Sequence, residues 1–543
     1  MNIRRLLYWL FVATGLLCGV AVVSTGVVLA VRLSMLPKPA EIGAGGSGDE
    51  NNSGAGQGNS ETDPRRRFAP EPFDPSRQDE QLASAAKPSV DSTSPPISIT
   101  EEQKPPIDPP KPPPSLPPPA PPPRKLTAIE RASGSFFGPT PADPQSRPQM
   151  VEIVVPEIRG ASAIWGATGR DDRGRIWYGV SCERGEPPSA HLIEMDPTTL
   201  QSVDRGDVVG ELTRLGLARP GDQQSKIHSK IVQAADGHLY FSSMDEAGEL
   251  ALEGKPPTFG SHLWRLRLDG YRWEHLAAVP EGLIVVGTGG RYVYALGYYG
   301  HVLYQYDIQT GVLRNVRVGS TAGHVSRNFL VDARGHAYVP RLVDAPAVAG
   351  APLGKPQWLA TLVEYDTELK EMGESPLPNY LDPQVFPENS HGIVGVSPLA
   401  DGSLALLTHV GQLYRVVPPQ GKGPPRGEGR ASVESQGWMH PAGASYAPSL
   451  FSYDGQRWLL SVGRRGNEQG EGKYAWLARD QATGQSLARE LTIVELFQPS
   501  RQGMLLYGSA TRDFQGRFYV AGRYVWRDGD SQPMLMRIEP PQD

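Results

Sequence analysis

Cysteine is nearly absent from this sequence, which contains only Cys18 and Cys182. Cys18 lies in a long apolar segment near the N-terminus, so the rest of the chain holds a single thiol. We therefore expect neither an internal disulfide nor a zinc site built from paired Cys-x-x-Cys motifs there. A lone cysteine such as Cys182 is usually a small packed residue.

Long basic runs and local catalytic signatures are also missing. The lack of a long basic run argues against nucleic acid as the main partner, whereas the formal net charge of -6 is ordinary for a soluble protein and indicates no particular partner. The sequence contains no Gly-x-Ser-x-Gly elbow, phosphate loop or His-Glu-x-x-His motif. No nucleophile is marked by local sequence, so chemistry has to be sought in the arrangement of the fold.

One long apolar run stands near the N-terminus. Residues 6–31 contain no charged residue and exceed the roughly 20 residues that span a bilayer core. Arg4 and Arg5 precede the run, which predicts a cytoplasmic N-terminus. The alternative is a cleaved signal peptide, whose apolar core is usually about 7–15 residues and ends at a small-x-small site. We interpret residues 1–36 as an uncleaved transmembrane signal anchor. The remainder of this single-pass protein is then extracytoplasmic, in a periplasm or at a cell surface.

Residues 37–149 have the composition of a stalk. Their first part is rich in Gly, Ser and Asn and cannot bury enough apolar surface to offset chain entropy. Residues 104–125 then read KPPIDPPKPPPSLPPPAPPPRK, a proline-rich stretch that favours the stiff polyproline II conformation. We predict a disordered linker that ends in a semi-rigid spacer; a docking site for proline-binding modules is the alternative.

Residues 150–543 contain a sevenfold repeat of a tight turn followed by a short β-rich run, with no long helical periodicity. The turn glycines are Gly174, Gly237, Gly290, Gly335, Gly402, Gly455 and Gly516. A second β-rich element follows each turn, and several copies end in Asp-x-x-Thr, a turn signal. One repeat therefore predicts four antiparallel strands, which is one blade of a β-propeller.

The two ends of this region complement each other. The seventh repeat lacks an outer strand, whereas residues 150–155 (MVEIVV) precede the first inner strand without a blade of their own. We predict that this segment completes the last blade and hides the sheet edges by closing the ring. The fold prediction is thus all-β, a seven-bladed β-propeller closed by an N-terminal strand and preceded by one transmembrane helix and a proline-rich linker.

The repeat, Asp-x-x-Gly-x-[Ile/Phe/Leu]-[Trp/Tyr] followed by a Tyr-Asp-x-x-Thr-Gly-like turn, resembles those of NHL, streptogramin-lyase-like and quinoprotein-like propellers. The resemblance covers nearly three quarters of the chain and implies the architecture, whereas this scaffold hosts binding modules, sensors and enzymes alike. Streptogramin lyases and pectate-type propeller lyases are similar in build and use histidines with a metal at the channel. A matching His-x-Glu signature is not found in this sequence.

Histidines recur at one position of the repeat. His228, His324 and His391 stand nine to eleven residues before the turn glycines of the second, fourth and fifth repeats. Equivalent blades would bring the three side chains to the mouth of the central channel. Imidazole nitrogens are ligands of divalent metals, so a metal site is one hypothesis. Binding of a ligand without metal and a structural role for each ring are the others.

Aromatic and charged residues accompany these histidines. We predict that they form the rest of a binding site: Trp165, Tyr446, Tyr507, Lys226, Arg327, Asp245 and Glu246, with Lys230 beside them. A mixed rim of this kind suits a polar or anionic ligand such as a carbohydrate or peptide, and an extracytoplasmic protein is a further candidate partner. The first functional hypothesis is a tethered extracytoplasmic binding module, since tethering raises local concentration. The alternative is a metal-assisted lyase with a histidine-lined central site.

Overall fold

The computed structural model describes residues 148–247, 256–320, 324, 326–345, 358–381, 391–419, 429–453, 457–464, 474–491, 501–526 and 529–539. The predicted anchor (1–36) and almost all of the predicted stalk (37–149) lie outside these ranges, so both stay predictions. Within the described ranges, no helix is long and apolar enough to cross a bilayer.

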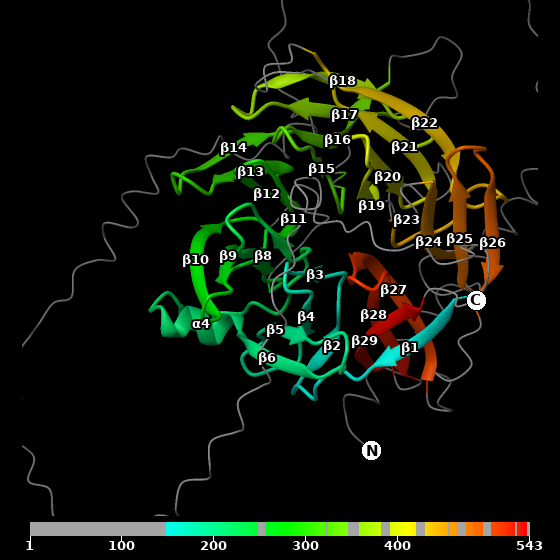
Figure 1. Ribbon diagram of the computed structural model, residues 1–543. Coiled ribbons are helices and arrows are strands. Elements are labelled where there is room, and N and C mark those ends of the chain that lie inside the picture. The colour runs from blue at the N-terminus through cyan, green and yellow to red at the C-terminus, as the bar shows by residue number, and fades with distance from the viewer. Residues whose placement is uncertain are drawn as a thin grey trace, which may run out of the picture. The chain divides into compact units, whose positions relative to one another are not determined.

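The described residues form seven antiparallel sheets arranged around a common centre (Figure 1). The innermost strands are β3 (Thr168–Arg170), β7 (Val232–Gln233), β11 (Leu283–Gly289), β15 (Leu330–Val331), β19 (Ile393–Pro398), β23 (Phe451–Tyr453) and β27 (Arg501–Arg512). The second strands are β4 (Ile176–Cys182), β8 (Leu239–Met244), β12 (Tyr292–Gly297), β16 (Ala337–Asp344), β20 (Leu404–Thr408), β24 (Trp458–Arg464) and β28 (Phe518–Trp526). The third strands are β5 (His191–Met195), β9 (Ser261–Arg267), β13 (Val302–Asp307), β17 (Trp358–Tyr365), β21 (Gln412–Val417), β25 (Tyr474–Asp480) and β29 (Ser531–Glu539). The outermost strands are β6 (Ser202–Asp207), β10 (Arg272–Val279), β14 (Leu313–Arg317), β18 (Glu371–Pro376), β22 (Ser432–Trp438), β26 (Ser486–Glu490) and β1 (Gln149–Ile153). The predicted seven-bladed propeller is confirmed.

The N-terminal strand closes the ring. β1 pairs antiparallel with β29, from Gln149 opposite Glu539 to Ile153 opposite Leu535. In Figure 1 the cyan β1 lies beside the red strands of the last blade. The predicted closing strand is therefore confirmed, and the outer edge of β29 is covered.

Apolar packing occurs between blades. Seven buried clusters are found among the described residues, and each joins at least two neighbouring sheets. The cluster between the last and the first blade contains Ile153 of β1, Tyr178 of β4 and Tyr519 of β28. Because every interface around the ring has its own core, removal of one cluster would open the ring at that point.

A buried carboxylate organises the turn between the first two strands of three blades. Asp171, Asp332 and Asp513 each accept two backbone N–H bonds within the turn. The other carboxylate oxygen accepts from the side chain six residues later, which is Trp177, Tyr338 or Tyr519. The glycine three residues after the aspartate has a positive φ, for example +84° at Gly174. The repeat is thus a hydrogen-bonded turn rather than a mere spacing of apolar residues.

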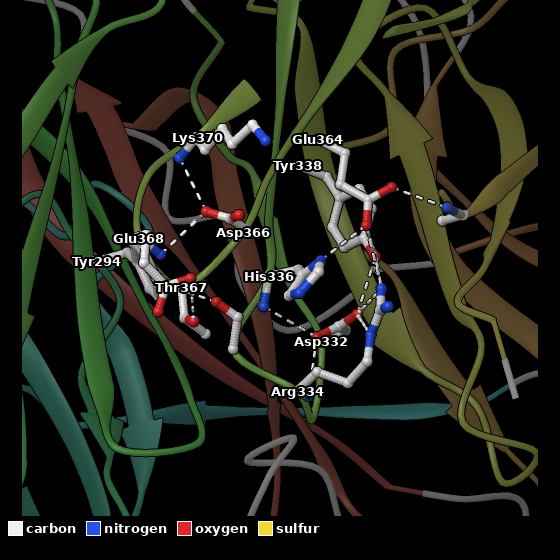
Figure 2. Close-up of polar contacts among 12 residues, drawn as sticks. Tyr294, Asp332, Arg334, His336, Tyr338, Glu364, Asp366, Thr367, Glu368 and Lys370 are labelled. Carbon is white, nitrogen blue, oxygen red and sulfur yellow. Dashed lines mark hydrogen bonds and ion pairs between the residues drawn. The ribbon is translucent and has the colours of Figure 1, made fainter. Parts of the chain in front are cut away.

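Blade 4 shows this turn together with its neighbours (Figure 2). Glu364 of β17 accepts from the His336 ring at 2.8 Å and from Arg334 at 3.1 Å. Its second oxygen accepts from the backbone N–H of Ala431, next to β22 of blade 5, at 2.8 Å. The left side of Figure 2 shows Asp366, which accepts from the backbone N–H groups of Glu368 and Lys370 in the next turn. Polar side chains thus fix both turns and tie two blades together.

Blade 1 departs from the regular pattern. Its inner edge is divided between β2 (Ala161–Ala163), opposite the end of β4, and β3, opposite its beginning. A short helix, α4 (Val208–Arg214), follows β6, and Asp207 caps it by accepting from the N–H of Gly210. Val208 and Leu212 of the helix pack into the cluster between blades 1 and 2. The break in the inner edge places Trp165 between β2 and β3.

Candidate functional site

The segments that lead into the inner strands meet at one end of the ring. Isolated bridges join Lys226 to Met244 at the end of β8, and Tyr446 to Arg464 at the end of β24. These segments therefore share a face with the connections that leave the second strands.

A small cavity of about 40 Å³, which we call the mouth cavity, lies at that end of the ring centre. Its lining residues come from all seven blades: Trp165, Gly166, His228, Lys230, Ile284, Val285, Arg327, Asn328, His391, Val394, Tyr446, Pro448 and Gly508. Five of the predicted site residues, Trp165, His228, Arg327, His391 and Tyr446, are thus brought together. The cavity has room for a few water molecules or the tip of one side chain.

A second cavity of about 130 Å³, the channel cavity, is bordered by inner strands. It is lined by Thr168, Gly169 and Arg170 of β3, by residues 230–233 and 286–288, and by parts of β15, β19 and β27. Lys230 and Asn328 line both cavities. These two residues therefore mark the boundary between the mouth and the channel.

Trp165 is the centre of an aromatic and cationic stack. Its ring lies 4.4 Å from that of Tyr507 and 6.1 Å from the nearly parallel ring of His228. The Lys226 ammonium stands 4.2 Å over the indole. The indole N–H of Trp165 is buried and has no hydrogen-bond partner in the described structure. Tyr507 contacts the Trp165 ring but is not among the residues that line the mouth cavity.

His228 is held as a neutral ring. Burial lowers its pKa to about 3, and the charges of Arg327 and Lys226 add to this effect. Its Nδ1 lies 3.2 Å from the carbonyl oxygen of Ile284. Because a carbonyl only accepts, Nδ1 carries the proton, which leaves Nε2 with a lone pair. His228 can therefore accept a hydrogen bond or coordinate a cation.

His324 and His391 have different surroundings. His324 is only 5 % exposed, hydrogen-bonds Tyr380 Oη at 3.0 Å and does not line the mouth cavity. Burial lowers its pKa to about 3. His391 lines the cavity, and its ring centroid lies 4.7 Å from that of His409.

In the part of the chain that is described, no group of three His, Cys, Asp or Glu side chains could hold a metal ion. The tentative metal site at these three histidines stays a prediction.

The predicted acidic residues lie beside the mouth rather than in it. Lys226 forms ion pairs with Glu246 at 2.5 Å and Glu183 at 3.4 Å. Asp245 is fully buried and accepts from the backbone N–H groups of Ala247 and Phe259. Asp245 therefore fixes a connection, while Glu246 neutralises Lys226.

Arg327 and Tyr446 connect the mouth to the fold. The backbone N–H of Arg327 donates to the carbonyl of His391, which joins the segments leading into blades 4 and 5. Tyr446 donates to the carbonyl of Leu506 at 2.6 Å, and the Arg464 guanidinium stands 5.2 Å over its ring. Both residues thus have fixed positions on the cavity wall.

Sequence reasoning did not predict every lining residue. Ile284 and Val285 belong to the apolar run of β11, and such a run reads as core. Lys230 was recognised only as a neighbour of the histidines, because one lysine in a polar segment is usually solvated. One feature of the sequence does indicate that Lys230 lines the cavity. Lys230 stands two positions after His228, in a segment expected to face the channel.

No protein-family model matches the chain, and no curated protein matches it. Among solved structures, the chain is similar to the β-propeller domain of Myceliophteria thermophila Cps50 (Swd1), with 11 % identity and a TM-score of 0.41, over 71 % of this chain and 99 % of that one. It also aligns with a chain of a nidogen/laminin complex, with 11 % identity and a TM-score of 0.31, over 61 % and 94 % of the two chains. The fold assignment rests on the seven sheets themselves.

Proposed function

We propose that this protein is a membrane-tethered, extracytoplasmic binding propeller that engages a partner protein at the end of the ring around the mouth cavity. The observation that carries the proposal is the meeting of Trp165, Arg327 and Tyr446 at one cavity, from three different blades. Trp, Arg and Tyr dominate the energetic centres of protein interfaces.

The size of the mouth cavity favours a protein partner over an enclosed small molecule. Pockets that enclose drug-sized ligands measure roughly 300–1,000 Å³, whereas this cavity measures about 40 Å³. A partner that lies across the ring and inserts one side chain fits such a site. The predicted anchor and stalk would hold the propeller near the membrane and raise its local concentration there.

A charge reversal at the mouth tests this proposal. We expect full-length Arg327→Glu to lose capture of partners from the extracytoplasmic fraction by about tenfold or more, as for an interface centre. Arg314→Glu is the matched control, because Arg314 is exposed on the outermost strand β14, far from the ring centre in the blade order. Quantitative mass spectrometry of proteins captured by each variant is the measurement. Equal capture by Arg327→Glu, with an unchanged melting temperature, would contradict a partner site at the mouth.

A further inference from the structure

We propose that the centre of the ring holds a carboxylate-binding site at Lys230, between the mouth cavity and the channel cavity. The ligand is a small carboxylate, either free or carried on the end of a peptide. This inference rests on the two cavities and their lining, and it holds whether or not a partner protein docks at the mouth.

The Lys230 ammonium has no counter-charge in the described part of the protein. None of the hydrogen bonds or ion pairs of the described structure involves its amine, although Lys230 borders both cavities. Lys226, four residues earlier, has Glu246, Glu183 and the Trp165 ring as partners. A partly buried cation with no anion nearby is costly, and burial lowers the pKa of Lys230 to about 8. It therefore still carries its charge at neutral pH, which an anion would compensate.

The lining of both cavities is basic and lacks carboxylates. No Asp or Glu is found among the described residues that border either cavity. Arg327 borders the mouth cavity, and Arg170 and Arg512 border the channel cavity. Arg170 donates to the Arg512 carbonyl at 2.7 Å, and the Arg512 guanidinium stands 4.8 Å over the Tyr453 ring. These arginines contribute a positive potential, and Lys230 remains the group for direct contact.

A second unsatisfied donor belongs to a residue that lines the mouth cavity. The indole N–H of Trp165 is buried and has no hydrogen-bond partner among the described residues, and Trp165 lines the mouth cavity together with Lys230. Buried donors are normally satisfied, so an acceptor is expected at this position. A carboxylate has two acceptor oxygens and can therefore serve more than one donor.

Cavity size limits what the ligand can be. The channel cavity of about 130 Å³ is close to the engineered cavity of about 150 Å³ that holds one benzene. A carboxylate on a body of a few carbon atoms fits this space, whereas a nucleotide or an oligosaccharide does not. Ordered water alone would fill the space but would leave the charge of Lys230 uncompensated.

Ligand-dependent thermal stability of the full-length protein tests the site. Acetate, sulfate and chloride are compared at equal ionic strength for the wild type, for Lys230→Met and for Lys370→Met. Lys370 is an exposed lysine in the turn of blade 4, so its replacement makes the same change of charge away from the channel. We expect acetate to raise the melting temperature of the wild type and of Lys370→Met by a few degrees relative to chloride. Lys230→Met should show no such shift.

A peptide arm separates the two sources of the carboxylate. Trialanine with a free C-terminal carboxylate is compared with trialanine amide. If acetate has no effect but the acid raises the melting temperature and the amide does not, the ligand is a peptide-borne carboxylate and the proposal stands. Equal shifts with sulfate, equal shifts in Lys230→Met, or no shift with any probe would overturn it. Loss of partner capture in Arg327→Glu does not bear on these outcomes, so the two proposals fail separately.

Discussion

The buried charge of Lys230 lowers the free energy of unfolding of the propeller, and the size of this effect depends on pH. Burial lowers its pKa from the ordinary 10.5 to about 8, which corresponds to about 3 kcal/mol at most against the charged form. Between these two values the unfolded chain binds more protons than the folded one. The contribution of Lys230 to the free energy of unfolding therefore rises with pH across that window, and the full cost is present below about pH 8.

We predict that Lys230→Met is more stable than the wild type at pH 7, by up to about 3 kcal/mol, in the absence of anionic ligand. The difference should shrink as the pH rises toward about 10. Urea denaturation of both proteins at several pH values measures it, with Lys370→Met as the control for loss of a positive charge. A destabilised Lys230→Met at pH 7 would mean that Lys230 has a structural role, which contradicts our interpretation.

Single residues also show where sequence reasoning succeeds and where it ends. His228 and His391, which stand at equivalent distances before their turn glycines, both line the mouth cavity. His324 has the same spacing but packs on Tyr380, which follows the outer strand of its blade, and does not line the cavity. Spacing determines the depth of a residue along a blade, whereas side-chain direction depends on neighbours that lie far away in the sequence.

At the scale of the element, the buried aspartate of the turn is the feature that makes the repeat recognisable. Asp332 accepts from the backbones of Arg334 and His336 and from Tyr338 Oη, and it is 2 % exposed. Removal of its carboxylate leaves these buried donors without partners. Water cannot replace the lost bonds at such a site.

We predict that Asp332→Ala lowers the free energy of unfolding by about 2–4 kcal/mol, since each unsatisfied buried donor costs about 1–3 kcal/mol. Asp366→Ala is the matched control, because Asp366 also accepts two backbone N–H bonds, but in a turn with exposed residues (Figure 2). The control should lose about 1 kcal/mol or less. Chemical denaturation of the three proteins compares them, and equal losses would show that burial of the turn does not matter.

The turn positions of the blades could be predicted from the sequence, because a tight turn requires glycine at a residue with positive φ. Of the seven turn glycines, Gly174, Gly237, Gly290, Gly335, Gly402 and Gly516 have the positive φ that a tight turn requires, while Gly455 lies outside the described residues. The break between β2 and β3 could not be predicted, because it depends on contact with other blades. Gly166, in that break, approaches Gly508 of the last blade so closely that a Cβ would lie 2.1 Å from its carbonyl oxygen.

At the scale of the whole molecule, stability depends on the strand that comes first in the described chain. β1 supplies the outer strand of the last blade, and Ile153 packs with Tyr519 and Leu535 in the cluster between the last and first blades. The outer edge of β29 is covered, and the ring is closed, only when β1 is paired with β29.

We predict that Ile153→Asp destabilises the entire ring, by about 3 kcal/mol or more, because it places a charge in an apolar cluster. The adjacent Val154→Asp is the control: Val154 is 83 % exposed, whereas Ile153 is 2 % exposed, and surface changes of this kind stay within about 0.5 kcal/mol. Urea denaturation measures the stabilities, and size-exclusion chromatography detects association through an uncovered β29 edge. If both variants unfold like the wild type and stay unassociated, β1 is an accessory strand and the ring closes without it. A loss confined to Ile153→Asp, with new oligomers, would establish the N-terminal strand as the closure on which all seven blades depend.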